Sequence, residues 1–474
     1  MKITVNLVCL IAGLVFCGQG KAQNLPNVLV FIADDLGYLD TEIAGSPDAI
    51  TPNVRLLANQ GLVFERAYVN SPSCAPSRAA LFTGLRSQRN GVEENHDITR
   101  FDGVNHILTG FQSKGYEIAA FGKIRHGKLD GPDQWDHGIE HYGKTDFDVA
   151  ELEEYLASRD ASRPLLLMVG SRPPHVPWPP HSSFEPAKIS LPVKSIDTPR
   201  TREIRSRYLQ DVKNMDDQFG QALAAFEHHS EGDEIVLFTS DHGAQWPFAK
   251  WNLYETGTRV PMIVKWQGKV PAGQSTQALV SWIDIFPTLT ELVGGGLENN
   301  IDGRSFADVL LNGKPQHRSQ VFTTHTGDGN GKKAHNSYPM RAVVTERFKY
   351  IRNLHPEYVF STHTVKNVFL DHNSYWPDWT QKAQSSATAA SIVKAYLSRP
   401  AEELYDLVTD PYEQHNLAME PDYTRVLLTL RGEIDNLMQA SQDTGRVAGN
   451  PIRLVDCWRD GCQLTQTKPN EAND

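Results

Sequence analysis

Short runs of apolar residues recur along the first half of the chain and alternate with longer amphipathic stretches. The runs are residues 27–33 (NVLVFIA), 116–121, 164–170 (PLLLMVG), 234–239 (EIVLFT) and 261–264. Continuous apolar runs of this length are typical of strands that are buried on both faces of a parallel sheet. The pattern therefore predicts strands in the interior of a mostly parallel sheet.

The amphipathic stretches between these runs predict helices. Thr51-Pro52-Asn53 opens one helix with a proline in its first turn. Residues 200–228 form a long amphipathic stretch, and residues 284–292 form a shorter one. Strands that alternate with helices predict an α/β sandwich. In such a fold, ligands bind at the carboxyl ends of the strands.

The pattern changes near residue 335. Residues 340–353 (MRAVVTERFKYIRN) alternate between apolar and polar positions, as in a hairpin with its turn near Glu346 and Arg347. Residues 404–417 are rich in turn-forming residues, and residues 423–440 have the spacing of an amphipathic helix. We therefore expect a smaller C-terminal subdomain that contains an antiparallel sheet.

The N-terminus has the features of a secretory signal peptide. Lys2 precedes an apolar run over residues 3–16, and small residues follow up to Ala22. The run is shorter than the roughly 20 residues that a membrane span needs. We expect cleavage after Ala22, no membrane span, and export to the periplasm or the medium. The predicted organisation is a signal peptide over residues 1–22, a catalytic domain over residues 23–335 and the C-terminal subdomain over residues 336–474.

Charge narrows the range of partners. The formal net charge is −11, so the chain has no global basic field of the kind that attracts nucleic acid. We expect no nucleic-acid partner. An anionic substrate must instead be bound by local cations against the overall negative charge.

The cysteines suggest one special residue. Two of the five cysteines lie in the predicted signal peptide. Cys457 and Cys462 enclose four residues and are expected to form a small-loop disulfide in an exported protein. Cys74 is then unpaired, which in a secreted chain indicates a reactive or modified thiol. The alternative for Cys74 is a small buried hydrophobic residue.

Acidic residues end two of the predicted strands. Asp34 and Asp35 follow residues 27–33, and Asp241-His242-Gly243 follows residues 234–239. Adjacent carboxylates at the end of a buried strand are costly unless a cation neutralises them. With one imidazole nitrogen they form an oxygen-rich site for a hard divalent cation. The alternative is a pair of separate helix N-caps.

Cys74-Ala75-Pro76-Ser77-Arg78 joins these residues into a family pattern. With the two acidic strand ends, this Cys-x-Pro-Ser-Arg run resembles the type I sulfatases of the alkaline phosphatase superfamily, over about residues 27–417. The resemblance implies an alkaline-phosphatase-like α/β sandwich, whose large mostly parallel sheet is flanked by helices. It also implies one calcium ion, held by Asp34, Asp35, Cys74, Asp241 and His242.

The same resemblance implies that a formylglycine-generating enzyme oxidises Cys74 to formylglycine (3-oxoalanine). One hydroxyl of the hydrated aldehyde attacks the sulfur of a sulfate ester, and the other later expels sulfate. Arg78 lies one helical turn after Cys74 and would hold this hydrate. Lys123 would bind sulfate. His126 would contact the second hydroxyl and act as a base, with Arg125 as the alternative residue that faces the site.

Two further positions match the family. Lys250 corresponds to a basic residue that contacts sulfate, with a solvated surface lysine as the alternative. His175 follows Pro173-Pro174 and resembles the histidine that protonates the leaving-group oxygen. A structural role is the alternative for His175.

The C-terminal segments favour one branch of the family. Residues 335–343, 403–407 and 410–417, with the paired C-terminal cysteines, look most like the sulfamidases (heparan N-sulfatases). That branch has Asp-Asn-Gly where this chain has Asp241-His242-Gly243, and arginine where it has Lys250. Bacterial relatives of the branch include enzymes that remove O-sulfate from algal polysaccharides such as ulvan.

These observations predict an exported sulfatase that acts on a sulfated polysaccharide or its oligosaccharides, either algal or glycosaminoglycan. The alternatives are an N-sulfoglucosamine sulfamidase acting on heparan fragments, a phosphoester hydrolase of the same superfamily, and a non-catalytic glycan-binding protein. His96, His325 and Arg341 are expected to contact the glycan, with surface polar residues as the alternative.

Overall fold

The computed structural model describes residues 25–459, except for residues 97–100, 102, 105, 107, 127–134, 141–145, 231, 297–299, 328–336, 363–373 and 448–450. The predicted signal peptide and the predicted disulfide between the side chains of Cys457 and Cys462 lie outside this described part. Among the helices of the described part, none has both the length and the apolar character to cross a bilayer.

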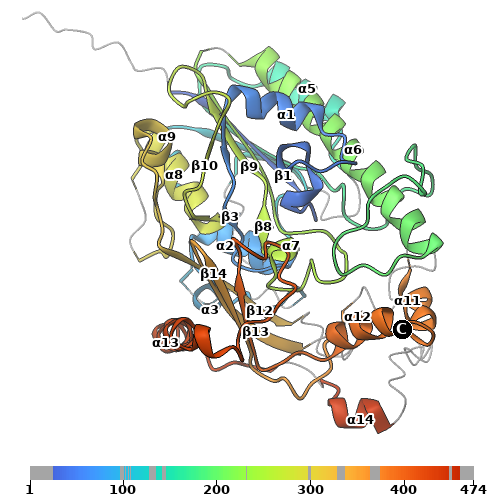
Figure 1. Cartoon of the computed structure of the whole chain (residues 1–474). Coiled ribbons are helices and arrows are strands. Elements are labelled where there is room, and N and C mark those ends of the chain that lie inside the picture. The colour runs from blue at the N-terminus through green and yellow to red at the C-terminus, as the bar shows by residue number, and fades with distance from the viewer. Residues whose placement is uncertain are drawn as a thin grey trace, which may run out of the picture.

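A large sheet of eight strands forms the centre of the molecule (Figure 1). Its strands lie in the order β10 (Gln274–Thr276), β2 (Leu62–Phe64), β9 (Met262–Trp266), β7 (Glu234–Ser240), β1 (Asn27–Ala33), β6 (Leu165–Gly170), β4 (Glu117–Gly122) and β5 (His137–Glu140). Strand β1 pairs in parallel with β6 and β7, and β4 pairs in parallel with β5 and β6. The predicted mostly parallel sheet is confirmed.

One predicted strand runs in the other direction. The apolar run over residues 261–264 was expected in a parallel strand, but β9 pairs antiparallel with both β7 and β2. A run that is buried on both faces carries no sign of its direction, because direction is set by the connection to the preceding strand.

Both faces of the sheet are covered, which explains the continuous apolar runs. In β1, Leu29 and Phe31 belong to one core cluster, whereas Val28 and Val30 belong to the other. The first cluster includes α1 (Pro52–Gln60), α5 (Val149–Ser158) and α6 (Pro199–His229). The second includes α2 (Cys74–Thr83), α4 (Thr109–Gln112), α8 (Ile285–Leu292) and α9 (Ala307–Asn312).

A second, antiparallel sheet forms the C-terminal part, as predicted. Its strands lie in the order β12 (Gln320–Gly327), β13 (Ser337–Thr345), β14 (Phe348–Asn353) and β15 (Glu402–Asp406). The predicted hairpin is β13–β14, and the predicted helix over residues 423–440 is α13 (Thr424–Ala440), whose Leu430 and Ile434 pack against this sheet. Strand β12 lies before residue 336, and β15 overlaps the start of the segment over residues 404–417, which was expected to be rich in turns.

The remaining elements are short or peripheral. A small sheet consists of β11 (Val280–Ser281), β3 (Ala67–Tyr68) and β8 (Arg259–Val260). The other helices are η1 (Tyr38–Asp40), η2 (Glu42–Ala44), α3 (Ser87–Asn90), α7 (Glu255–Thr258), η3 (Trp282–Asp284), α11 (Trp376–Ala383), α12 (Ala387–Leu397), η4 (Pro421–Tyr423) and α14 (Leu454–Arg459).

Candidate active site

Helix α2 places Cys74 at its first turn. Ser73 precedes the helix in an extended conformation, and its carbonyl accepts the first helical hydrogen bond from Ser77 N at 3.0 Å. Pro76 stands in the same turn, where a missing N–H costs no helical hydrogen bond. Cys74 is 1% exposed. The thiol therefore lies in the interior, at the helix end whose free N–H groups favour negative charge.

The two acidic strand ends are adjacent because β1 and β7 are neighbours in the sheet. Ala33 pairs with Ser240 in the parallel register, so Asp34 and Asp241 follow side by side. The Asp241 N–H donates to the Ala33 carbonyl at 3.1 Å, and the Asp35 N–H donates to Asp241 Oδ1 at 3.1 Å. Asp35 has a φ of 67°, in the left-handed region that aspartate tolerates better than most residues.

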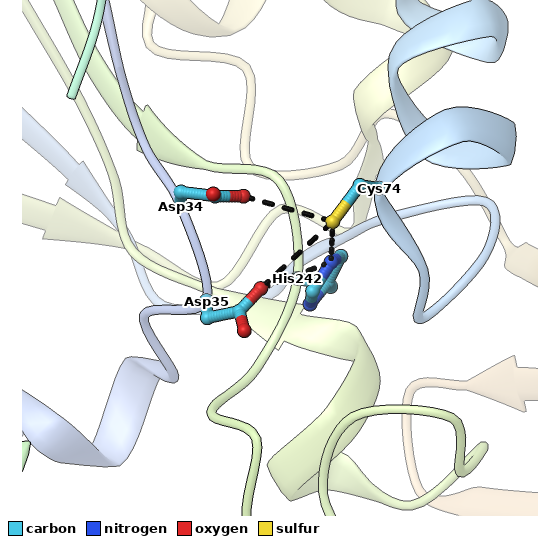
Figure 2. Close-up of side chains that lie close together, drawn as sticks. All are labelled: Asp34, Asp35, Cys74 and His242. Atoms are coloured by element: carbon cyan, nitrogen blue, oxygen red, sulfur yellow. Dashed lines mark hydrogen bonds and ion pairs between the residues drawn. The ribbon is translucent and has the colours of Figure 1, made fainter. Parts of the chain in front are cut away.

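Cys74 and three of the predicted metal ligands converge on one point (Figure 2). Asp34, Asp35, Cys74 and His242 each offer a ligand atom, and these atoms lie within 4.8 Å of one another. Cys74 Sγ is 3.3 Å from His242 Nε2 and 3.7 Å from Asp34 Oδ1. Asp241 stands beside the cluster, with its Oδ2 at 3.6 Å from His242 Nε2.

The donor chemistry of this cluster fits a divalent cation. Its carboxylate oxygens are the ligands that hard cations prefer, and His242 adds one nitrogen. His242 Nδ1 lies 3.0 Å from the Gly243 carbonyl, which directs Nε2 to the cluster. Burial acts to lower the pKa of His242, but Asp241, Cys74 and Asp35 outweigh it and raise this pKa to about 9. The carboxylates thus create a site that attracts positive charge.

Arg78 connects both acidic strand ends from α2. Its Nε donates to Asp241 Oδ2 at 2.9 Å, and its Nη2 donates to Asp34 Oδ1 at 3.3 Å. Nη1 donates to the carbonyls of Lys123 and Ile124. The side chain has no exposed surface. A guanidinium presents several donors in a fixed plane, which a lysine at this position would not reproduce.

Two buried lysines lie on either side of Cys74. Lys123 Nζ donates to Asp34 Oδ2, and Lys250 Nζ lies 2.8 Å from both carboxylate oxygens of Asp35. Each ammonium is 3.6 Å from Cys74 Sγ. Lys250 is 2% exposed, so the surface-lysine alternative is wrong.

This arrangement favours negative charge at position 74. Burial alone would raise the pKa of the Cys74 thiol. Lys123, Lys250 and His242 outweigh burial and hold that pKa well below its ordinary value. The same surroundings would stabilise an oxyanion on any group that replaces the thiol.

The two candidate proton-transfer histidines differ in their settings. His126 is half-buried beside Cys74 and hydrogen-bonds to it, and burial lowers the pKa of His126 against the effect of that bond. His175 follows β6, and its Nδ1 lies 2.6 Å from the Val176 carbonyl. Nδ1 therefore carries the proton that bonds to this carbonyl, and Nε2 remains for a substrate.

The three expected glycan contacts lie in different environments. His96 is exposed, and its ring centroid is 5.9 Å from that of His126. His325 in β12 is 1% exposed, with its ring 6.0 Å from that of Trp251. Arg341 in β13 is fully buried, and its Nε and Nη2 donate to the Asp443 carboxylate. Contact of these three residues with the substrate stays a prediction. Of the three, only His96 is exposed.

Several supporting residues escaped sequence reasoning. Asn95 Oδ1 accepts the Ala75 N–H at 3.0 Å and so fixes the start of α2. Asn252 Nδ2 donates to the Lys250 carbonyl at 3.1 Å, and Arg399 Nη2 donates to Asn252 Oδ1 at 2.6 Å. Asn95 is adjacent in sequence to His96, a predicted site residue, and this position could have indicated that Asn95 also lies at the site. Arg399 is remote in sequence, and no motif marks it.

Comparison with known proteins gives consistent matches. The sulfatase family model matches residues 26–295, and the model of the N-sulphoglucosamine sulphohydrolase C-terminal region matches residues 242–373. An ulvan-active sulfatase of Formosa agariphila is 28% identical over 458 residues, covering 94% of this chain and 86% of the relative. Human N-sulphoglucosamine sulphohydrolase is 26% identical over 472 residues, covering 86% of this chain and 89% of the relative.

A solved structure shares the fold. It contains a protein in complex with its substrate D-glucosamine-2-N,6-O-disulfate, and it superposes with a TM-score of 0.67 at 18% identity. The match covers 89% of this chain and 99% of that chain. The two proteins therefore share the fold over most of their length.

Proposed function

The chain belongs to the sulfatase family and is a sulfuric ester hydrolase, and we propose that it is exported and acts on a sulfated polysaccharide or its oligosaccharides. The ulvan-active sulfatase of Formosa agariphila supports this substrate class. The observation that carries the proposal is the buried position of Cys74, between two lysines and against the Asp34, Asp35 and His242 cluster.

We propose that Cys74 is oxidised to formylglycine by a formylglycine-generating enzyme. In its hydrated form this residue supplies a hydroxyl that can attack sulfur and a second hydroxyl that can expel sulfate. The α2 N-terminus and the two lysine ammoniums favour negative charge at this position. Arg78 keeps Asp34 and Asp241 in place around it.

The cluster fits one calcium ion, held by Asp34, Asp35, Asp241, His242 and the residue at position 74. When bound, the ion would polarise a sulfate oxygen and offset the charge of the carboxylates. The nitrogen of His242 is a less usual ligand for calcium than an amide oxygen. This difference makes His242 the residue most expected to alter metal preference relative to the sulfamidase branch.

The remaining residues have roles toward the substrate. Lys123 and Lys250, each 3.6 Å from Cys74 Sγ, are placed to contact the sulfate oxygens. His175 presents Nε2, and when the ring is doubly protonated a proton can pass from Nε2 to the leaving-group oxygen while Nδ1 keeps its bond to the Val176 carbonyl. His126, whose pKa is lowered, is neutral at pH 7 and can accept a proton from the group at position 74.

A second candidate is an N-sulfoglucosamine sulfamidase. The C-terminal family model over residues 242–373 and the human relative favour it. His242 and Lys250 differ from the Asp-Asn-Gly motif and the arginine of that branch. The two candidates share the reaction at sulfur and differ in the atom that leaves, which is oxygen in one and nitrogen in the other.

Sulfate release from three substrates tests these proposals. The modified enzyme and Cys74→Ala are incubated with ulvan oligosaccharides, heparan fragments and a phosphate ester, and mass spectrometry reports the state of residue 74. Release from ulvan supports the main proposal, and release of N-sulfate from heparan supports the second. Faster turnover of the phosphate ester would favour a phosphoester hydrolase. Full activity of Cys74→Ala would rule out the role of formylglycine.

A further inference from the structure

A second polar pocket lies where the segment after α2 meets η3 and the start of β12. Its volume is about 140 Å³. Three arginines line it together with polar and apolar residues: Arg86, Arg304, Arg318, Ser281, Ser319, Gln320, Ile283, Val321 and Phe322. None of these residues belongs to the candidate active site. In a chain with a net charge of −11, a pocket with three arginines is a local exception.

The carboxylates near the pocket do not balance its cations. Asp302 accepts from both Arg86 Nη1 at 3.2 Å and Arg89 Nη1 at 2.7 Å. Asp284 accepts from Arg318 Nε at 2.7 Å. Of the three lining arginines, Arg86 is paired with Asp302 and Arg318 with Asp284, whereas the Arg304 guanidinium has no carboxylate partner among the described residues.

Several donors of these arginines have no acceptor within the described part of the chain. Arg304 is exposed, and its side chain makes no hydrogen bond or ion pair there. Arg318 Nη1 and Arg86 Nε and Nη2 make no hydrogen bond there either. A guanidinium only donates hydrogen bonds. The pocket therefore offers N–H donors from three side chains that do not bond to acceptors in the described residues.

Burial lowers the pKa of Arg86, and the nearby Arg318 and Arg89 lower it further, whereas Asp302 acts in the opposite direction. The net pKa lies below its ordinary value. A guanidinium whose charge is disfavoured by burial gains from a bound anion, because the anion offsets part of the cost of burial.

We propose that this pocket binds a sulfate-type oxyanion, supplied either as free inorganic sulfate or as a sulfate ester group on a carbohydrate. Converging guanidiniums suit an anion with several acceptor oxygens. Phe322 lies on one side of the pocket, with the Arg86 guanidinium 5.4 Å from the centre of its ring. The pocket is too small for a chain of sugars, so it would hold one anionic group.

The pocket is separate from Cys74. Helix α2 has ten residues and is about 15 Å long, and Arg86 follows its far end. The Gly84 carbonyl accepts hydrogen bonds from the Asp302 and Gly303 N–H groups at 2.8 and 2.9 Å. These bonds attach the loop that carries Asp302 to the C-terminal end of α2. Binding of an anion in the pocket is thus separate from binding at the candidate active site and does not require catalysis.

Selenate, an anomalous scatterer with the shape of sulfate, tests the site directly. The full-length protein and Arg304→Glu are crystallised and soaked with selenate, and Arg425→Glu, which changes another exposed arginine, serves as the matched control. We expect an anomalous peak among the three arginines in the wild type and the control, and none in Arg304→Glu. No peak in the wild type, or an equal peak in Arg304→Glu, would overturn the proposal.

A competition arm identifies the source of the anion. Displacement of selenate from the pocket by a sulfated oligosaccharide, in the Cys74→Ala background, would identify a carbohydrate ester as the ligand. Displacement by inorganic sulfate alone would identify the free anion. Because Cys74→Ala removes turnover, this result does not depend on the proposed function, and either proposal can fail without the other.

Discussion

Arg399 gives the sharpest prediction, because it reaches from the C-terminal part of the chain to the segment that carries Lys250. Its Nη2 donates to Asn252 Oδ1 at 2.6 Å, and Asn252 in turn donates to the Lys250 carbonyl at 3.1 Å. Its Nε donates to the Tyr396 carbonyl at 3.2 Å, and its Nη1 donates to the Tyr254 hydroxyl. The residue is 4% exposed.

The magnitude follows from what Arg399→Ala leaves behind. Asn252 Oδ1 and the Tyr396 carbonyl lose a donor in the interior, at about 1–3 kcal/mol each. The guanidinium also packs against four rings, the nearest being Phe360 at 4.6 Å. We expect the free energy of unfolding to fall by about 3–5 kcal/mol. Arg399→Lys keeps the charge but serves fewer acceptors, so it should lose less.

The assay combines unfolding in urea with kinetics at a temperature where every variant is folded. If Arg399 positions Lys250 through Asn252, kcat should fall by about tenfold or more, since a small displacement of a positioned group is costly, with partial rescue in Arg399→Lys. Arg425→Ala, at an exposed position, should change neither quantity. A stability loss with unchanged kcat would refute the positioning role, and stability unchanged within about 1 kcal/mol would refute the packing argument.

Three further predictions follow from single residues. His175→Ala should lower kcat by about 10²–10⁴-fold on a sugar sulfate but far less on an aryl sulfate, whose leaving group needs no proton. The control is His181→Ala, at an exposed position. Equal losses of kcat on both substrates would contradict a role of His175 as general acid. Burial raises the pKa of Asp211 from 3.8 to about 7. The contribution of the protonated Asp211 carboxyl to the stability of the fold is therefore fully present below about pH 3.8 and is lost as the pH rises through 7. Asp211→Asn should therefore be more stable than the wild type at pH 8, by up to about 4 kcal/mol, and should lose this advantage toward pH 4; a difference in urea unfolding that does not vary with pH would contradict this reasoning. Calcium should raise the thermal midpoint of the wild type by binding the folded state, and Asp35→Asn should abolish most of this rise; an equal rise in both would place the ion elsewhere.

The sequence predicted the parallel strands well, because a strand buried on both faces has a continuous apolar run. It also placed Asp34, Asp35, Asp241 and His242 together, since neighbouring parallel strands end at the same edge of a sheet. It could not give the direction of β9, which depends on a connection without periodic pattern. It missed β15 because residues 402–406 form a short strand whose neighbours are turns.

Other parts of the site depend on contacts between segments far apart in sequence. Lys250 is 2% exposed because Asp35 and the Arg399–Asn252 contact hold its segment inside the protein. The apolar and aromatic neighbours of Lys250, such as Phe248 and Trp251, indicate a buried segment, but they do not show what neutralises the lysine there. Arg341 was predicted to contact the glycan, with a surface polar residue as the alternative, but in β13 it is buried against Asp443, which lies 102 residues later. Pairings of this kind appear only when the chain is folded.

The depth of Cys74 has a consequence for the order of events in the cell. The side chain is 1% exposed and begins a helix in which every residue is buried. An enzyme that modifies Cys74 needs access to the thiol and to the residues around it, which the folded protein does not give. If Cys74 is oxidised as proposed above, oxidation must therefore precede folding, while the segment around Cys74 is still extended. A chain that folds first would then remain unmodified, and the yield of active protein would be set by the relative rates of modification and folding.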